Sequence, residues 1–174
     1  MIGLPALALC RGAESMVALS DVEVAVISRE KLGAFFEESP RLAAILFLIS
    51  QEERVAAMDR LATISATDAP QRLAALLIDI HTRLKRSEPA TGSVFDLPLT
   101  QNDVAALIGI SPAHLSRILP WFRKSRLIAW TRHRMTILDH DALAALAGLP
   151  TRRVDQEVKW LPRRRVGAGR SAGG

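Results

Sequence analysis

The stretch LTQNDVAALIGISPAHLSRIL, residues 99–119, interrupts a helical pattern at Gly109 and restarts it within three residues. Thr100 followed by Asp103 forms a capping-box-like start, so the sequence predicts a capped helix that begins after Thr100. Gly109 supplies the positive φ that ends this helix, and Ser111, followed by a proline, caps the next one. Two helices specified locally and joined by so short a connection are expected to meet at a steep angle.

The apolar positions of the two segments fit such a crossing. The small residue Ala105 lies where two crossed helices come closest, and Ile110 lies at the corner between them. A helical hairpin shares part of this pattern, but the Ala and Gly at these spacings favour a helix-turn-helix. The apolar and turn positions of this scaffold are Val104, Ala105, Ile108, Gly109, Ile110, Leu115 and Ile118.

Two short strand-like runs follow, LIAW and MTIL, and the residues TRHR join them as a hairpin. The tip of this hairpin is basic, because it carries Arg132, His133 and Arg134. A helix-turn-helix followed by a basic hairpin predicts a winged-helix domain. Its second helix, residues 112–119, would enter the major groove of DNA, and the wing, residues 131–134, would touch the flanking backbone.

The residues DHDALAALAG predict a closing helix that is capped by Asp139 or Asp141 and stopped by Gly148. The DHD triplet could also bind a metal, but helix capping accounts for it. The sequence shows no Gly-rich phosphate loop, no nucleophile elbow and no other His, Cys or carboxylate set. We therefore expect no enzyme activity, no catalytic residue, no metal and no cofactor.

Positive charge is segregated along the chain. Residues 1–98 have ten Lys/Arg and thirteen Asp/Glu, whereas residues 99–138 have six Lys/Arg and one Asp. From Thr151 onward, seven basic residues accompany two acidic ones. A basic region around the predicted helix-turn-helix favours a polyanionic partner, since each neutralised phosphate releases counterions. A solvated basic face without a partner is the alternative.

The N-terminal part of the chain is β-rich. The run SMVALSDVEVAVIS predicts two short strands, Met16–Leu19 and Glu23–Ile27, which would need a sheet or helices to pack on. The opening MIGLPALALC has no basic region ahead of its short apolar run, so we expect no secretion signal. No apolar run approaches the length of a membrane span, and the single cysteine, Cys10, is expected to be an inert thiol.

A long helix is predicted next. After a short helix that stops at Pro40, neither Gly nor Pro occurs from Arg41 to Ile64. Apolar residues repeat every seven positions along it, which favours a dimer helix over residues 41–64, although packing within its own domain is the alternative. A further helix, with Thr67 or Asp68 as its cap, and the polar linker KRSEPATGS lead to the helix-turn-helix. The seam residues are Ile45, Leu48, Val55, Met58, Leu61 and Ala62.

Several segments resemble the Crp/Fnr family of bacterial transcription regulators, from about Ser15 to Leu146. These segments are ALSDVEVAVISREKL, SPRLAAILFLI, QRLAALLIDI, LTQNDVAALIGIS, LSRIL and RMTILDHDALAAL. The resemblance implies a mainly α fold with small β, and a homodimer that binds a two-fold symmetric operator in double-stranded DNA, with RNA polymerase as a candidate further partner. The expected organisation is a β-roll sensor remnant (1–38), a long dimerisation helix (39–66), a winged helix-turn-helix domain (67–150) and a basic disordered tail (151–174).

In that family the recognition helix reads bases from its N-terminal half, which is SPAHLSR in this chain. The resemblance makes His114, Ser116 and Arg117 the base-reading residues, with Arg117 suited to two hydrogen bonds with a guanine. Many members have Arg-Glu where this chain has Pro112 and Ala113, so that pair of contacts is absent. The residues expected to contact the DNA backbone are Thr100, Gln101, Ser111, Arg123, Lys124, Arg132, His133 and Arg134.

Two further positions depart from the family's scaffold. Pro120 has no N–H, so we expect the carbonyl of Ser116 to lose its partner and the helix to kink or end there. Arg126 stands at a turn position where the family usually has Gly, which predicts backbone strain or rearrangement.

The front of the chain departs more from the family. Gly3 is followed by Leu4 rather than Glu, no Arg–Ser/Thr pair is placed to hold a phosphate, and the cysteine set of iron–sulfur sensors is absent. We therefore expect no cyclic-nucleotide binding. Two interpretations stay open. In the first, the chain is a cytoplasmic, nucleoid-associated, sequence-specific regulator that is either shortened or acts without a ligand. In the second, it is a truncated paralogue that serves as a dimerisation and protein-interaction module. The tail either adds non-specific DNA affinity or has no role.

Overall fold

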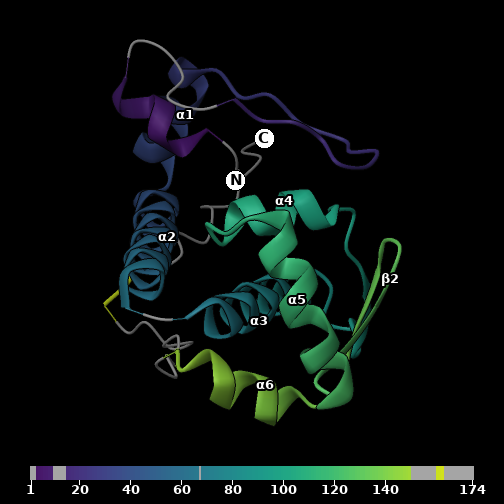
Figure 1. Ribbon diagram of the computed structural model, residues 1–174. Helices are drawn as coiled ribbons and strands as arrows, with labels where there is room; N and C mark the ends of the chain where they lie inside the picture. The colour runs from purple at the N-terminus through teal and green to yellow at the C-terminus, as the bar shows by residue number, and fades with distance from the viewer. Residues whose placement is uncertain (1–2, 10–14, 67, 150–159, 163–174) are drawn as a thin grey trace, which may run out of the picture. The chain divides into compact units, whose positions relative to one another are not determined.

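The computed structural model describes residues 3–9, 15–66, 68–149 and 160–162 (Figure 1). Within these residues the chain is mainly helical, with one small antiparallel sheet. It divides into two compact units, one made of Met1–Ala56 with Arg153–Gly174 and the other of Ala57–Arg152. No helix among the described residues is long and apolar enough to cross a membrane. Cys10 and, apart from residues 160–162, the tail 151–174 lie outside the described residues.

The first unit contains the 3₁₀ helix η1 (Leu4–Ala8), the helix α1 (Arg29–Glu38) and the start of α2 (Pro40–Ala66). The side chain of Arg29 donates hydrogen bonds of 2.8 Å to the carbonyls of Ala6 and Leu9, which ties η1 to the start of α1. Ser28 caps α1 by accepting a hydrogen bond from the backbone N–H of Lys31.

The predicted strands Met16–Leu19 and Glu23–Ile27 are wrong, because neither range forms a strand in the structure. Side chains in both remain in solvent, with Val17 81% and Val26 92% exposed. A strand is held by ladder hydrogen bonds and by a buried face, and a two-stranded piece without a packing partner is unstable. Within the described residues, the segment therefore has β propensity but no strand to pair with.

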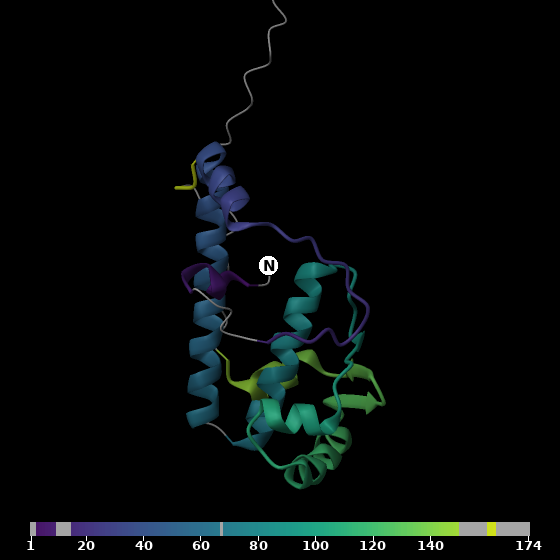
Figure 2. The same cartoon turned by 90° about the horizontal axis from the view of Figure 1, so that it is seen from above.

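The predicted long helix is confirmed as α2, which runs as one continuous helix (Figure 2). It is longer at both ends than residues 41–64, beginning at Pro40 and ending at Ala66. None of its side chains that the structure describes is buried. Most of the apolar seam predicted for it is exposed, as Met58 and Leu61, 57% and 69% exposed, illustrate, whereas Leu48 is partly buried.

In the second unit, α3 (Ala69–Ser87) supplies one wall of the core. Asp68 and Gln71 form a full capping box at its start, which identifies Asp68 as the cap. Leu73, Ala74 and Leu77 on its inner face are completely buried. The helix packs chiefly against α6 (His140–Ala147), which begins at the cap Asp139 and ends at Gly148 with φ 61°, as the sequence predicts.

Three strands form the sheet: β1 (Val94–Asp96), β2 (Ile128–Thr131) and β3 (Arg134–Ile137), in the order β1-β3-β2. The β2–β3 pair is the predicted hairpin. The sequence does not predict β1, which pairs with β3 so that Phe95 lies opposite Met135. Both of these side chains are buried, so the extra strand extends the core beneath the hairpin.

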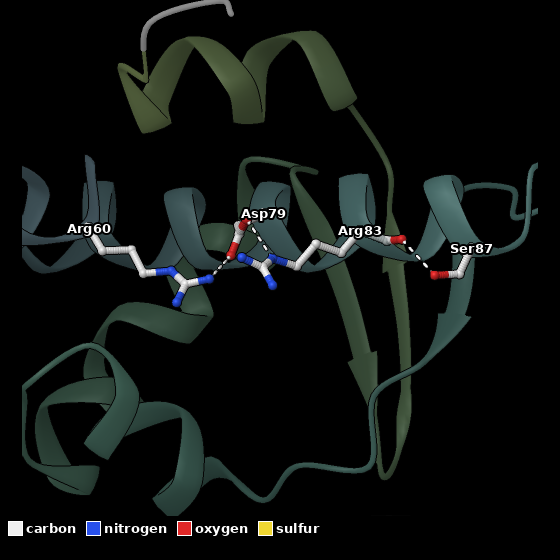
Figure 3. A network of polar contacts seen from close by, with 4 residues as sticks. All are labelled: Arg60, Asp79, Arg83 and Ser87. Atoms are coloured by element: carbon white, nitrogen blue, oxygen red, sulfur yellow. Dashed lines mark hydrogen bonds and ion pairs between the residues drawn. The ribbon is translucent and has the colours of Figure 1, made fainter. Parts of the chain in front are cut away.

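An ion-pair network joins the last part of α2 to α3 (Figure 3). Asp79 accepts hydrogen bonds from Arg60 at 2.8 Å and from Arg83, one turn further along α3, at 3.1 Å. The hydroxyl of Ser87 in turn donates to the backbone carbonyl of Arg83. All four residues belong to the second unit.

Candidate nucleic-acid interface

The first helix of the candidate site, α4 (Gln101–Leu107), is closed at both ends by local contacts. The Thr100 hydroxyl oxygen accepts from the backbone N–H of Asp103, and the Asp103 carboxylate accepts from the backbone N–H of Thr100 at 2.8 Å. A hydrogen bond from the Thr100 hydroxyl and the one from its backbone N–H hold the pKa of the Asp103 carboxyl below its usual range. The predicted capping box is therefore complete, with Asp in the place of the usual Glu.

The break at Gly109 is a Schellman turn. The N–H of Ile110 donates to the carbonyl of Ala105 at 3.0 Å, and the N–H of Gly109 donates to the carbonyl of Ala106 at 3.2 Å. Gly109 has φ 67°, a conformation that costs other residues about 1–2 kcal/mol. The turn thus satisfies the last carbonyls of α4 and redirects the chain at once into the next helix.

The second helix, α5 (Pro112–Lys124), begins at Ser111, whose hydroxyl oxygen accepts from the backbone N–H of His114. It does not end at Pro120, so the expected limit of 112–119 is wrong. Pro120 itself is exposed, while Leu119 and Phe122 beside it are buried in the core. The packing of these two side chains holds the last turn in helical form despite the hydrogen bond that Pro120 does not make.

The two helices pack as a helix-turn-helix. Val104, Ala105 and Leu115 are completely buried, and Ile108 is nearly so. Ile110 and Ile118 are partly buried against the same core. On the opposite side of α5, Ser116 and Arg117 are exposed and His114 is half-buried. The helix therefore presents a polar surface from its first two turns while its apolar face is fixed underneath.

The hairpin is held at its tip by two hydrogen bonds. The indole N–H of Trp130 donates to the carbonyl of Arg132 at 3.0 Å, and the backbone N–H of Leu97 donates to the carbonyl of His133. Arg132 has φ 52°, so the turn uses a positive φ at a residue other than glycine. The side chains of Arg132, His133 and Arg134 are all exposed. The wing is thus a fixed ridge with a basic tip.

A family model for the Crp-like helix-turn-helix domain matches residues 71–146, the range that contains most of α3, the sheet, α4, α5 and most of α6. The chain belongs to the Crp/Fnr family. Members of this family are DNA-binding transcription regulators and not enzymes.

Relatives with curated sequences support the assignment. The fumarate and nitrate reduction regulatory protein of Salmonella typhimurium is 30% identical over 131 residues, which are 75% of this chain and 52% of the relative. A probable transcriptional activator of Rhizobium leguminosarum bv. viciae is 31% identical over 132 residues, 74% of this chain and 54% of the relative. This Crp/Fnr chain therefore spans about half the length of these relatives.

Solved structures share the fold. FixK2 from Bradyrhizobium japonicum superposes with a TM-score of 0.61 at 18% identity, covering 72% of this chain and 61% of that one. A transcriptional regulator of the Crp/Fnr family from Thermus thermophilus gives a TM-score of 0.50 at 20% identity, covering 63% of this chain and 55% of that one.

In this Crp/Fnr domain the residues expected to contact the DNA backbone do not form one cluster. Thr100 and Ser111 use their side chains as helix caps, and Gln101 is exposed in the first turn of α4. Arg123 and Lys124 lie in the last turn of α5, about 17 Å along its axis from Pro112 at ~1.5 Å per residue. They are exposed but lie at the opposite end of α5 from the predicted reading residues.

On the wing, Arg134 already has a neighbour of opposite charge. Its Nε lies 3.7 Å from Oδ1 of Asp96, with which it pairs in the β1–β3 register. Both side chains are largely exposed, so this ion pair is weak. The sequence carries no sign of this pair, because Asp96 becomes a neighbour of Arg134 only through the pairing of β1 with β3.

The strain predicted at Arg126 is confirmed. Arg126 follows the end of α5 with φ 54°, in the left-handed region that glycine adopts more easily. Its backbone N–H donates to the carbonyl of Arg123, and the next residue, Leu127, donates to the carbonyl of Phe122. These two hydrogen bonds end α5 with the kind of turn that usually has glycine at the position of Arg126.

Two residues of α3 carry no sequence signal. Arg72 on α3 lies against the α4–α5 turn, with its Nη1 atom 3.8 Å from the position that a Cβ on Gly109 would occupy. His81 is buried, stacks on Phe95, and lies 5.5 Å from His140 between ring centres. Within the described residues no group of three or more His, Cys, Asp or Glu is arranged to hold a metal ion.

Proposed function

We propose that this chain binds double-stranded DNA in a sequence-specific manner and acts as a transcription regulator. In this proposal α5 enters the major groove, His114, Ser116 and Arg117 read base edges, and the wing contacts the flanking backbone. Binding of operator DNA would place its site of action in the cytoplasm, at the nucleoid. RNA polymerase is the further partner that we propose for the regulator.

The observation that carries the proposal is the two-sided character of α5. Leu115, Leu119 and Phe122 are at most 2% exposed, which fixes the helix on the core, while Ser116 and Arg117 between them are exposed. An exposed arginine on the second helix of a helix-turn-helix has the donor geometry for O6 and N7 of guanine. Ser116 beside it is suited to either a base or a phosphate.

The remaining backbone contacts are proposed at the helix starts and on the wing. Gln101 is exposed in the first turn of α4, and the wing displays Arg132 and His133. Thr100 and Ser111 would act through the N-terminal ends of the helices they cap, which favour anions. Arg123, Lys124 and Arg134 would add positive charge around the groove.

A homodimer on a two-fold symmetric operator is proposed from α2. Its apolar side chains are uncovered in the single chain, and among those described Ile45, Phe47, Val55, Met58 and Leu61 are exposed. Pairing of residues 41–64 between two copies would cover them. The two recognition helices would then face successive major grooves, one helical turn of DNA apart.

Selection of bound sequences from a random duplex library tests base reading. For the selected site, Arg117→Ala is expected to weaken binding by about 1–3 kcal/mol and to relax the preference at one position in each half-site. Arg123→Ala at the far end of α5 is the matched control, and it is expected to weaken binding to all sequences alike. An unchanged sequence preference in Arg117→Ala would contradict reading through α5.

The same exposed apolar seam favours a second candidate, a dimerisation and protein-interaction module that does not read DNA. The two functions differ in their response to salt. A DNA-binding regulator loses affinity for duplex DNA steeply as salt rises, whereas an interaction module that binds through α2 shows no such loss. A Leu61→Glu change, analysed by sedimentation, tests the dimer itself and is expected to give monomers.

A further inference from the structure

Arg72 is a partly buried cation without a partner among the described residues. It lies just after the capping box of α3, and its backbone N–H is used in the helix, bonding to the carbonyl of Asp68. Its Nε is buried and makes no hydrogen bond. Within the part of the chain that the structure describes, no side-chain hydrogen bond or ion pair of Arg72 is formed either. Asp68, one helical turn earlier, is used instead to cap the backbone N–H of Gln71.

An unpaired guanidinium at such a site is costly. A charged group that loses part of its hydration is normally compensated by hydrogen bonds or by an opposite charge. Arg83 on the same helix shows the compensated case, because it is paired with Asp79. Nothing within the described residues compensates Arg72 in this way, so the site has the character of a receptor for an anion that this part of the chain does not supply.

The position of Arg72 indicates which anion. Its Nη1 lies beside Gly109, in the turn that joins α4 to α5, and Ser111 at the start of the recognition helix follows two residues later. When a recognition helix lies in the major groove, the preceding helix crosses the sugar-phosphate backbone. In the proposed complex a phosphate would therefore lie near α4, and the turn that follows α4 is a candidate place for it. A guanidinium offers paired donors that match phosphate oxygens.

We propose that Arg72 binds a DNA phosphate beside the α4–α5 turn, as a backbone-positioning residue contributed from outside the helix-turn-helix. The inference rests on the proposed DNA binding. It adds α3 to the interface and brings a basic residue from the acidic first part of the chain, residues 1–98, into the basic surface. Because the contact is to phosphate, it strengthens binding without contributing to base preference.

Fluorescence anisotropy with a labelled mixed-sequence duplex, titrated over a range of salt concentrations, tests the contact on the full chain. Arg72→Gln is expected to make the slope of log K against log salt shallower by about 0.9 for each bound copy, and to weaken binding about tenfold at low salt. Arg72→Lys keeps the charge and is expected to restore most of the slope. Lys85→Gln is the control, since Lys85 lies in the last turn of α3, about 20 Å along the axis.

The outcomes separate this inference from the proposed function. If the wild-type chain shows no salt-dependent binding, both are overturned. If the wild type binds with a steep slope but Arg72→Gln has the slope of Lys85→Gln, only the inference is overturned, and an acidic protein partner or a structural role remains for Arg72. Thermal unfolding without DNA supplies a further readout, because removal of an unpaired, partly buried charge is expected to leave the melting temperature unchanged or raised. A lowered melting temperature together with an unchanged salt slope would assign Arg72 to the fold alone.

Discussion

Arg60 and Asp79 form an ion pair, with Nη2 of Arg60 2.8 Å from Oδ2 of Asp79, and this pair connects the last part of α2 to α3. The two side chains are 54% and 28% exposed, so solvent screens much of the attraction. We expect a double-mutant cycle of Arg60→Gln and Asp79→Asn to give a coupling free energy of about 0.5 kcal/mol, measured by urea unfolding. The coupling should shrink as salt is added. Equal values at low and high salt would contradict an electrostatic link.

Arg126→Gly is expected to stabilise the domain. Arg126 has φ 54°, and a left-handed conformation costs an L-residue about 1–2 kcal/mol, part of which is offset by the greater freedom of glycine in the unfolded chain. The expected gain in the free energy of unfolding is therefore about 0.5–1 kcal/mol. Arg126→Lys removes the guanidinium and keeps the strain, so it serves as the control and should leave stability nearly unchanged. A loss of stability in the glycine variant would mean that the Arg126 side chain itself holds the turn.

Pro120→Ala is expected to stabilise α5. The substitution restores an N–H that can donate to the carbonyl of Ser116 and removes the clash of the proline ring, an effect of about 1–3 kcal/mol in a helix interior. Pro120 is exposed, so no core contact is lost. Chemical unfolding measures the gain. Affinity for duplex DNA should not change, since Pro120 lies beyond the first turns of α5. A large change in affinity would show that the proline influences how the reading residues are placed.

His81 is expected to make stability depend on pH. Burial lowers the pKa of its imidazole below the ordinary 6.5, while the hydrogen bond from its Nε2 to the carbonyl of Gly92 opposes this shift and the nearby Lys85 and His140 add to it. Well above about pH 6.5 the ring is neutral in both states. As the pH falls below 6.5, the unfolded chain takes up a proton that the folded chain resists, so the free energy of unfolding decreases until the pH reaches the folded pKa.

Urea unfolding at about pH 7.5 and about pH 5.5 checks this dependence. His81→Gln keeps a side-chain N–H for the carbonyl of Gly92 but has no titrating ring, so its stability should vary less between the two values. His140→Gln is measured in the same way as a second variant. The side chain of His140 is half-exposed and its ring lies near Asp141. If the wild type and His81→Gln lose the same stability on acidification, His81 is not the source.

The helix-turn-helix could be predicted almost residue by residue, because its determinants are local. Thr100, Gly109 and Ser111 act on backbone groups within a few positions of themselves, and the apolar residues between them repeat with the period of a helix. The resulting caps and the turn are found where the sequence places them. The strain at Arg126 is predicted from the resemblance to a family that usually has Gly at this turn, and the structure shows it as a φ of 54°.

Features that depend on distant parts of the chain were missed or wrong. Local propensity predicts that α5 kinks or ends at Pro120, but burial of Phe122 keeps the helix going to Lys124. β1 is a three-residue strand that forms through its pairing with β3 and the burial of Phe95. Met16–Leu19 shows the converse, a segment with β propensity that finds no strand to pair with among the described residues. Arg72 is near Gly109 only through the packing of α3, which no periodicity reveals.

β3, the middle strand of the sheet, links the wing to the segment that leads into the helix-turn-helix. β3 is bonded on one side to β2 and on the other to β1, and the chain leaves β1 through Leu97, bonded to the carbonyl of His133, directly into Thr100 and α4. The wing tip and the start of the helix-turn-helix are therefore two ends of one short, hydrogen-bonded strip of backbone. If the chain binds DNA as proposed, the fold would therefore set the spacing between the groove contact and the flanking backbone contact.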